Sequence, residues 1–255
     1  MLSSWKLRVA GYLSHPLVGV LVAKIYANRI PTFGGRLCVD PHLVSPETVA
    51  TVFWRLFERS EVKLVSQYLR NDLDAIELGS GIGIVSLPAI RTQSPSKRLF
   101  CVEPNPRIVS MLKQSLQLNA PEKPVYVLNA AISYDSCQQV NLYVTDTHLG
   151  SHVVDQPSQK SVQVEAVKLE TLITAHSILD YVLICDIEGA EIGIFLNDAL
   201  SLNRCQQMII ELHDTSFGAQ SFSVEDLHSL ITHELGFSIE ARRHNVFVYS
   251  KRLQW

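Results

Sequence analysis

The stretch that decides the fold is Asp74-Ala75-Ile76-Glu77-Leu78-Gly79-Ser80-Gly81-Ile82-Gly83-Ile84. It starts as a short apolar strand, continues through three closely spaced glycines and ends where a helix begins. Glycines in such a turn let backbone N–H groups approach a ligand that a Cβ atom would hold away. The stretch therefore predicts a ligand site at the end of a buried strand.

Two later segments end in carboxylates where such a ligand would need them. The segment Phe100–Pro106 ends a second apolar strand at Glu103, 20 residues past Gly83. The segment Ile184–Glu191 ends a later strand in a run of acids. A single glycine turn is weak evidence, but three such segments in this order indicate a cofactor that carries a nucleoside.

From residue 73 onward the sequence alternates apolar strands with helices, which is typical of a parallel sheet covered on both faces. The fold class is therefore α/β, Rossmann-like and mostly parallel, with a C-terminal antiparallel hairpin at 237–241 and 246–249. Residues 71–255 would form this domain, and residues 1–70 a helical N-terminal extension packed on its core. The expected strands lie near 74–78, 99–103, 125–129, 140–144, 162–167, 181–185 and 207–212, and the expected helices near 83–92, 106–118, 188–196 and 224–235.

Composition and charge indicate which partners and which cell compartment suit the protein. A net charge of −3 and a pI near 6.3 lack the basic footprint of a nucleic-acid-binding protein. Five scattered cysteines, odd in number and without a Cys-x-x-Cys pair, indicate a reducing compartment, and we expect a cytoplasmic protein. The apolar segment 16–27 is shorter than the ~20 residues of a spanning helix. It is expected to pack on the core, with weak peripheral membrane contact as the alternative.

The spacing of the glycines separates two cofactors. A dinucleotide fingerprint requires a third small residue at position 84, where this chain has Ile84. Glu77 would repel a pyrophosphate but could hold an α-ammonium group, which favours S-adenosylmethionine over NAD. Glu103 can accept both hydrogen bonds of a ribose diol. The expected cofactor-binding residues are Glu77, Gly79, Gly81, Gly83, Glu103, Asn129, Ala130 and Asp186.

Seven segments together resemble the FkbM family of methyltransferases. They are 53–61, Glu77-Leu-Gly-Ser-Gly-Ile-Gly, Glu103-Pro-Asn-Pro, Asn129-Ala-Ala-Ile-Ser, Lys168-Leu-Glu-Thr-Leu, Asp186-Ile-Glu-Gly-Ala-Glu and Glu211-Leu-His. The resemblance covers about residues 50 to 215. It implies a class I enzyme dependent on S-adenosylmethionine, and an acceptor such as the hydroxyl of a sugar or of another small secondary metabolite.

The sequence departs from the family pattern at two places. Ser80-Gly81 stands where the family commonly has Ala-Asn, which a backbone contact would tolerate. Ile184 stands where the family commonly has lysine, so any role of that lysine is lost. This departure keeps open the alternative of a non-catalytic, cofactor-binding scaffold protein. A nicotinamide-dependent oxidoreductase is the rival enzyme.

Methyl transfer to a hydroxyl requires alignment of the reacting atoms and removal of a proton. The candidate catalytic residues are His213, Asp186 and Glu188. We expect His213 to be the base because the pKa of an imidazole lies near neutral pH, with Asp186 next. The alternative role of Glu188 is to stabilise a helix N-terminus, and that of His213 is a hydrogen bond to backbone.

A metal site is the remaining question at these strand ends. Asp186, Glu188, Glu211 and His213 have suitable ligand atoms. Glu211, however, should point to the opposite side of its strand from Leu212, and nothing in the sequence brings the four together. We therefore expect no metal.

Overall fold

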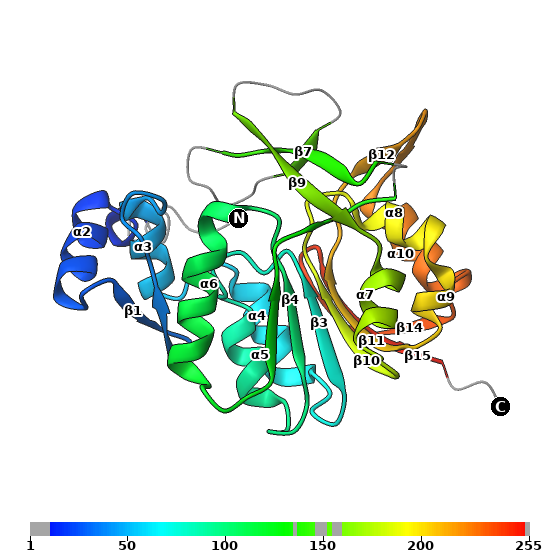
Figure 1. Cartoon of the computed structure of the whole chain (residues 1–255), viewed down its shortest axis with the longest axis horizontal. Coiled ribbons are helices and arrows are strands. Elements are labelled where there is room, and N and C mark those ends of the chain that lie inside the picture. Colours follow the sequence, from blue (N-terminus) through cyan, green and yellow to red (C-terminus); the bar gives the residue numbers. More distant parts are fainter. Residues whose placement is uncertain (1–10, 135–136, 146–151, 155–159, 253–255) are drawn as a thin grey trace.

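The centre of the protein is a seven-stranded sheet (Figure 1) in a computed structural model that describes residues 11–134, 137–145, 152–154 and 160–252. In spatial order its strands are β14 (Phe237–Arg243), β15 (Val246–Lys251), β11 (Cys205–Glu211), β10 (Tyr181–Cys185), β3 (Asp74–Leu78), β4 (Leu99–Val102) and β5 (Val125–Leu128). The last five are parallel, and β15 runs antiparallel to both of its neighbours. The expected fold class is confirmed.

The central strands are buried on both faces because helices cover each side (Figure 1). Alternate residues of a strand therefore enter two different cores, as Val182 and Leu183 do. One face packs on α4 (Arg59–Tyr68), α5 (Ser86–Thr92) and α6 (Pro106–Asn119). The other packs on α7 (Leu169–Ala175), α8 (Glu191–Asn197), α9 (Ala199–Leu202) and α10 (Val224–His233).

The N-terminal segment contains α2 (Pro16–Ile25), a hairpin of β1 (Arg29–Thr32) and β2 (Gly35–Cys38), and α3 (Pro46–Phe53). Ser45 caps α3 by accepting a hydrogen bond from the N–H of Thr48 at 3.2 Å, as its sequence indicates. The segment has no hydrophobic core of its own among the described residues. Its apolar side chains join the core of the first sheet face, where Ile30 and Leu37 belong to the same cluster as Leu112.

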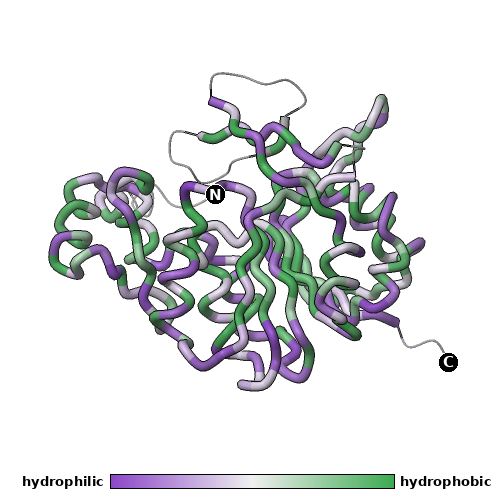
Figure 2. Tube along the Cα trace, viewed as in Figure 1, coloured by the Kyte–Doolittle hydropathy of each residue, from purple (hydrophilic) through white to green (hydrophobic). Residues whose placement is uncertain are grey.

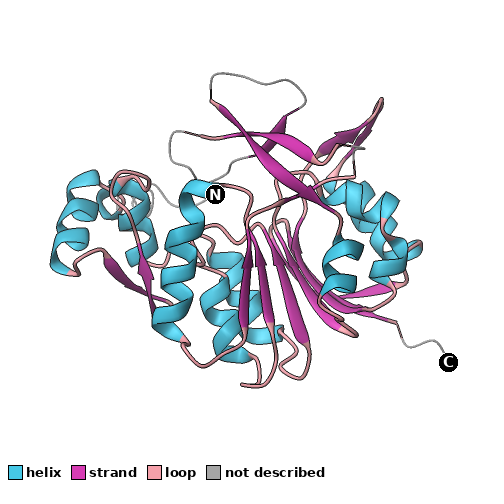
Figure 3. Ribbon diagram, viewed as in Figure 1, coloured by secondary structure: helices cyan, strands magenta, loops and turns pink. Residues whose placement is uncertain are grey.

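A second, four-stranded sheet interrupts the chain between β5 and α7. It has the order β6-β9-β7-β8 and a small core of its own. Figure 3 shows it above one end of the central sheet. A separate hairpin, β12 and β13, follows β11. The bounds are β6 (Ala131–Ile132), β7 (Gln139–Tyr143), β8 (His152–Val154), β9 (Ser161–Val167), β12 (Thr215–Phe217) and β13 (Gln220–Phe222).

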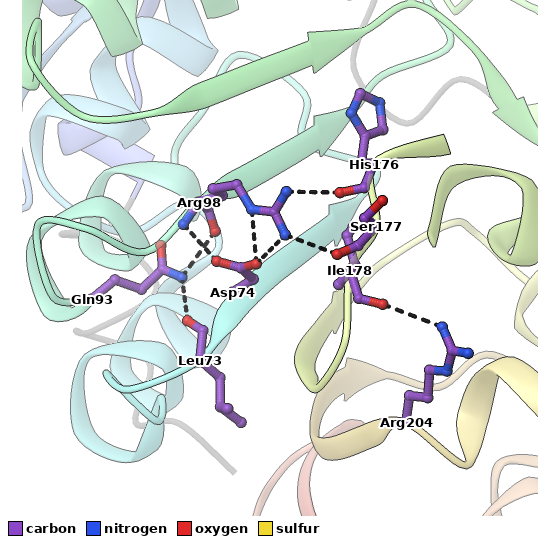
Figure 4. A network of polar contacts seen from close by, with 8 residues as sticks. All are labelled: Leu73, Asp74, Gln93, Arg98, His176, Ser177, Ile178 and Arg204. Carbon is purple, nitrogen blue, oxygen red and sulfur yellow. Dashed lines mark hydrogen bonds and ion pairs between the residues drawn. The ribbon is translucent and has the colours of Figure 1, made fainter. Parts of the chain in front are cut away.

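A polar network fixes the amino ends of the central strands, away from the second sheet (Figure 4). The Arg98 side chain donates to Oδ2 of Asp74 from Nε at 2.9 Å and from Nη2 at 2.6 Å, and the backbone N–H of Arg98 donates to Oδ1 at 2.8 Å. Its Nη1 donates to the carbonyl oxygen of His176 at 2.8 Å. Gln93 donates to the carbonyl oxygen of Leu73 at 2.9 Å. One guanidinium thus joins the start of β3 to the start of β4 and to the chain that leads into β10.

Candidate functional site

The three glycines of the turn after β3 differ in the space that surrounds them. All three have positive φ, namely 81° at Gly79, 53° at Gly81 and 93° at Gly83, a region that favours glycine. A Cβ at Gly79 would lie 1.8 Å from the carbonyl oxygen of Asp186, and one at Gly83 would lie 2.9 Å from Leu112. A Cβ at Gly81 would meet no protein atom within 4 Å. Gly81 therefore faces open space.

That space is a cavity of about 380 Å³ at the carboxyl ends of the parallel strands. The central sheet forms its floor, the second sheet contributes Leu142 and Val153, and the N-terminal segment contributes Thr48. Ligands bind at this edge of open α/β sheets, at the point where the strand order reverses. Here that point is β3, which lies between β10 and β4.

Glu103 lies in the cavity wall and is anchored by the backbone. Its Oε2 accepts a hydrogen bond from the N–H of Gly81 at 2.8 Å, and its Oε1 accepts one from the N–H of Asn105 at 2.7 Å. Burial raises the pKa of its carboxyl to about 7. A carboxylate has about four lone-pair sites, so each oxygen can accept one more hydrogen bond from a ligand.

The structure separates the two residues that follow β5. Ala130 lines the cavity. Asn129 is exposed and is not part of the wall, because its side-chain amide donates to the carbonyl oxygens of Glu103 and Pro104, each at 2.9 Å. Asn129 therefore holds the chain that carries Glu103 and does not itself line the cavity.

Glu77 also lies outside the wall of this cavity. Its side chain is buried on the face of the sheet that packs on α5. There its Oε2 accepts hydrogen bonds from Ser86 Oγ at 2.5 Å and from Cys101 Sγ at 3.3 Å. Burial raises the pKa of Glu77 to about 7. It borders only a smaller, adjoining space of about 20 Å³. The sequence placed Glu77 at the correct strand, but alternation along the strand turns its side chain into the core.

Asp186 and His213 converge, as expected from their positions after adjacent strands. His213 Nε2 lies 3.8 Å from Asp186 Oδ1 and 3.7 Å from Glu188 Oε2, and its Nδ1 lies 3.4 Å from Glu191 Oε1. The hydrogen bond to Glu191, followed by the nearby acids, raises the pKa of His213 to about 9. The expectation that His213 titrates near neutral pH is wrong, because three carboxylates surround the ring and favour its charged form.

Asp186, which lies beside His213, has a pKa near neutrality. Burial raises its pKa to about 7, while the charge of His213 acts in the opposite direction. Its Oδ1 is shielded from solvent and has no hydrogen-bond partner in the described part of the chain. Glu188 follows in the left-handed conformation with φ 55° and also lines the cavity. The proton-accepting role therefore suits Asp186 better than His213.

Sequence reasoning missed two acids of the cavity wall, Glu58 and Glu61, which come from the start of α4. Glu58 has a left-handed φ of 47°. Burial, followed by the charges of Asp186 and Glu61, raises the pKa of Glu58 well above its usual value. Both acids fall in the segment 53–61 that resembles the FkbM pattern, but a left-handed glutamate cannot be recognised from its neighbours in sequence.

Glu211 lies closer to Asp186 and His213 than its place in the sequence suggests. It lines the cavity, and ligand-capable atoms of Asp186, Glu211 and His213 all lie within 4.8 Å of one another. The expectation that nothing brings these side chains together is wrong for these three. Burial, followed by a hydrogen bond with Glu61, raises the pKa of Glu211 to about 8.

The charge of the cavity wall has a single sign. Among the residues that the structure describes, six carboxyl groups line it and no lysine or arginine does. His213 is a basic side chain beside these acids, with Nε2 3.8 Å from Asp186 Oδ1. The six acids are Glu58, Glu61, Glu103, Asp186, Glu188 and Glu211.

The strand order, the antiparallel β15 between β11 and β14, and the cavity beside a glycine turn define a Rossmann-like methyltransferase domain. A profile described as "Methyltransferase FkbM domain" matches residues 78–239, more than half of the chain. The protein belongs to the FkbM methyltransferase family, and S-adenosylmethionine is its methyl donor. The match starts after Glu77 and extends beyond the expected end near 215 into β14.

Solved structures with a similar fold are remote in sequence. Sp1610 of Streptococcus pneumoniae, named for tRNA (m1A22) methylation, is 10% identical, with a TM-score of 0.44 over 78% of this chain and 72% of that one. A precorrin-6y C5,15-methyltransferase of Geobacter metallireducens is 13% identical, with a TM-score of 0.40 over 74% and 86%. TrmK of M. capricolum is 8% identical, with a TM-score of 0.41 over 74% and 65%. A search of curated proteins found no match.

Proposed function

We propose that this protein transfers the methyl group of S-adenosylmethionine to a hydroxyl oxygen of a small, polyhydroxylated acceptor such as a sugar. The observation that carries the proposal is the cavity wall, to which the described residues contribute six carboxyl groups and no lysine or arginine. Carboxyl groups exchange hydrogen bonds with hydroxyl groups whether or not they are ionised, and the ionised ones repel phosphates. The wall therefore favours a neutral acceptor over RNA or a phosphorylated metabolite.

The chain supplies a matching place for the cofactor. Gly81 leaves space that a side chain would fill, and Glu103 has lone pairs free for the two hydroxyls of a ribose. Ala130 lines the same cavity. S-adenosylmethionine supplies a methyl group on a cationic sulfonium, a charge that suits a wall of acids. Glu77 and Asn129 support this site from behind through Ser86 and the backbone of Glu103.

Asp186 is the proposed proton acceptor. Its Oδ1 has no partner among the described residues, and a pKa of about 7 lets it take a proton and release it near neutral pH. His213, protonated at that pH, stabilises the carboxylate form of Asp186 from 3.8 Å. Glu191 in turn holds the imidazolium in place. Glu188 Oε2 lies 3.7 Å from the same ring nitrogen and adds a second carboxylate beside it.

The alternatives weaken for separate reasons. The family match decides against a nicotinamide-dependent oxidoreductase. A non-catalytic scaffold would account for Ile184 but not for a protonatable aspartate held beside an imidazolium in a cofactor-sized cavity. Five cysteines without a disulfide among them suit a reducing compartment such as the cytoplasm.

The proposal is tested with purified protein and S-adenosylmethionine labelled on its methyl group. We expect calorimetry to detect binding of S-adenosylmethionine and not of NADH. We expect label to enter neutral sugars or polyols from a panel that also contains their phosphorylated forms and bulk tRNA. Transfer of label to tRNA or only to the phosphorylated compounds would overturn the proposed acceptor class.

A further inference from the structure

The helix α2 presents an apolar face that the rest of the described chain leaves uncovered. Leu17, Leu21 and Ile25 follow one another at intervals of one helical turn, and they are 72%, 58% and 64% exposed. Val20 lies on the same face and is 53% exposed. Figure 2 shows this helix as a largely hydrophobic coil at the margin of the molecule.

The orientation of this helix is fixed by its opposite face. Val22 is buried, and a Cβ at Gly19 would lie 1.7 Å from the carbonyl oxygen of Pro46, so α2 approaches α3 at backbone distance. The apolar face therefore cannot turn inward without breaking the contact with α3. Solvent exposure of the face is a property of the folded chain.

Aromatic rings extend the apolar face beyond the end of the helix. Tyr26 packs on Phe53 with ring centroids 5.7 Å apart, and Phe53 packs on Trp54 at 5.0 Å. Tyr26 and Trp54 are 38% and 43% exposed. Tyrosine and tryptophan are the residues enriched at membrane–water interfaces, where one side of the ring is apolar and the other is wet.

Basic residues outnumber acids near the face: three lysines and arginines belong to this part of the chain, and the exposed acid Glu47 lies beside Pro46, where α3 meets α2. Lys24, Arg29 and Arg55 are exposed and have no ion-pair partner among the described residues. The first 45 residues of the sequence contain five lysines and arginines and one acid, whereas the whole chain has a net charge of −3. Basic character is thus concentrated in the segment that carries the apolar face, while the cavity wall is acidic.

We propose that α2 docks the protein on an anionic lipid surface, lying in the plane of the interface with Leu17, Leu21 and Ile25 inserted. A ten-residue helix is about 15 Å long, and no helix of the described chain has the length and hydropathy to cross a bilayer. An amphipathic helix flanked by cations is the form that binds at the surface.

A second copy of the chain fits the same face less well. A symmetric contact through α2 would bring Lys24, Arg29 and Arg55 toward their own copies, and like charges at an interface oppose association. An anionic surface is complementary to all three. The docked face lies one helix away from the cavity, because α3 packs on α2 and contributes Thr48 to the cavity wall.

The test is sedimentation of the full chain with vesicles of phosphatidylcholine and phosphatidylglycerol at 7:3, compared with phosphatidylcholine alone. We expect binding to the anionic vesicles, weakened at least tenfold by the double variant Leu21→Glu/Ile25→Glu and severalfold by Lys24→Glu/Arg29→Glu or by 0.5 M NaCl. The matched control is Leu179→Glu/Leu200→Glu, which alters residues that are 74% and 75% exposed elsewhere on the molecule and should bind as the unmodified chain does.

Three results would overturn the proposal. The first is absence of vesicle binding by the unmodified chain, and the second is an equal loss of binding in the α2 and control variants. The third is a concentration-dependent dimer in ultracentrifugation that Leu21→Glu abolishes, which would assign the face to a second copy. Calorimetry with S-adenosylmethionine should give the same affinity in all variants. Vesicle binding does not depend on the methyl acceptor, so its failure and failure of the proposed activity are distinguishable.

Discussion

The carbonyl oxygen of Asp186 occupies the position that a side chain at Gly79 would need, 1.8 Å from the ideal Cβ. The N–H of Asp186 also donates to the carbonyl oxygen of Leu78 at 3.0 Å. The turn that faces the cofactor and the loop that carries the proposed base are therefore built against each other. A change in one displaces the other.

The glycines of the turn should respond differently to substitution. Gly81→Val should yield a folded protein without measurable S-adenosylmethionine binding, because the side chain would enter the cavity. The left-handed φ of 53° would cost about 1–2 kcal/mol of stability. Gly79→Ala should destabilise the fold more, since it displaces Asp186. Calorimetry and thermal unfolding measure the two effects, and normal binding by Gly81→Val would contradict the assignment of the cavity.

Glu103→Ala should weaken S-adenosylmethionine binding by about 2–3 kcal/mol, or about 30- to 150-fold, because hydrogen bonds to a charged group are lost. Part of this loss arises because the N–H of Gly81, which donates to Glu103 Oε2 at 2.8 Å, would lose its hydrogen-bond acceptor. Glu122→Ala, an exposed acid in the loop before β5, is the control and should bind normally. Unchanged affinity of the Glu103 variant in calorimetry would remove this residue from the site.

Turnover should rise with pH through about 7, as Asp186 loses its proton. Asp186→Asn should reduce the rate by about 10²–10⁴ and abolish this dependence. The charge of His213 lowers the pKa of Asp186, so His213→Ala should shift the midpoint of the pH profile upward while His233→Ala leaves it in place. An unaltered midpoint in the His213 variant would show that the two groups are not coupled.

Without cofactor, the protein should be more stable at pH 5 than at pH 8. Glu77, Glu103 and Asp186 have folded-state pKa values raised to about 7, so the folded state binds more protons than the unfolded state above pH 5. The raised pKa of His213 acts in the same direction, because its stabilisation is complete below pH 6.5 and is lost as the pH rises through about 9. We expect a total loss on the order of 2–5 kcal/mol. Equal urea midpoints at the two pH values would contradict it.

Arg98→Ala should destabilise the fold by about 1–2 kcal/mol, less than a fully buried charged hydrogen bond, because the pair with Asp74 is partly exposed. The affinity of this variant for S-adenosylmethionine should not change, since the network lies at the start of β3 and the cavity lies at the carboxyl ends of the strands. The matched control is Arg70→Ala, which removes a more exposed pair with Asp72 and should cost less than ~1 kcal/mol. Similar urea unfolding of both variants would show that the network adds nothing.

The sequence allowed prediction of the elements whose pattern is local. Apolar strands next to glycine or acid, such as 74–78 and 181–185, were placed correctly because burial on both faces leaves a continuous apolar run. The β1 strand was missed because Pro31 and a four-residue length give no such run. The pKa of His213 could not be predicted, since it depends on Glu191, which a helix brings to the ring from 22 residues away.

The position of residues in the cavity was predicted less completely than the strands that carry them. Asp186, Glu103 and the glycines were identified because they follow strand ends directly. Glu58 and Glu61 were not, since they reach the cavity from α4 through a left-handed backbone at Glu58. Glu77 was assigned to the cavity because its place in the strand was known but the direction of its side chain was not.

The acids of α4 lie outside the stretch 78–239 that matches the family profile. Two of the six acids of the cavity wall therefore come from the part of the chain that precedes the family match, and the other four come from within it. Exchange of the first 70 residues between relatives would therefore alter one side of the cavity while leaving Gly81, Glu103 and Asp186 in place.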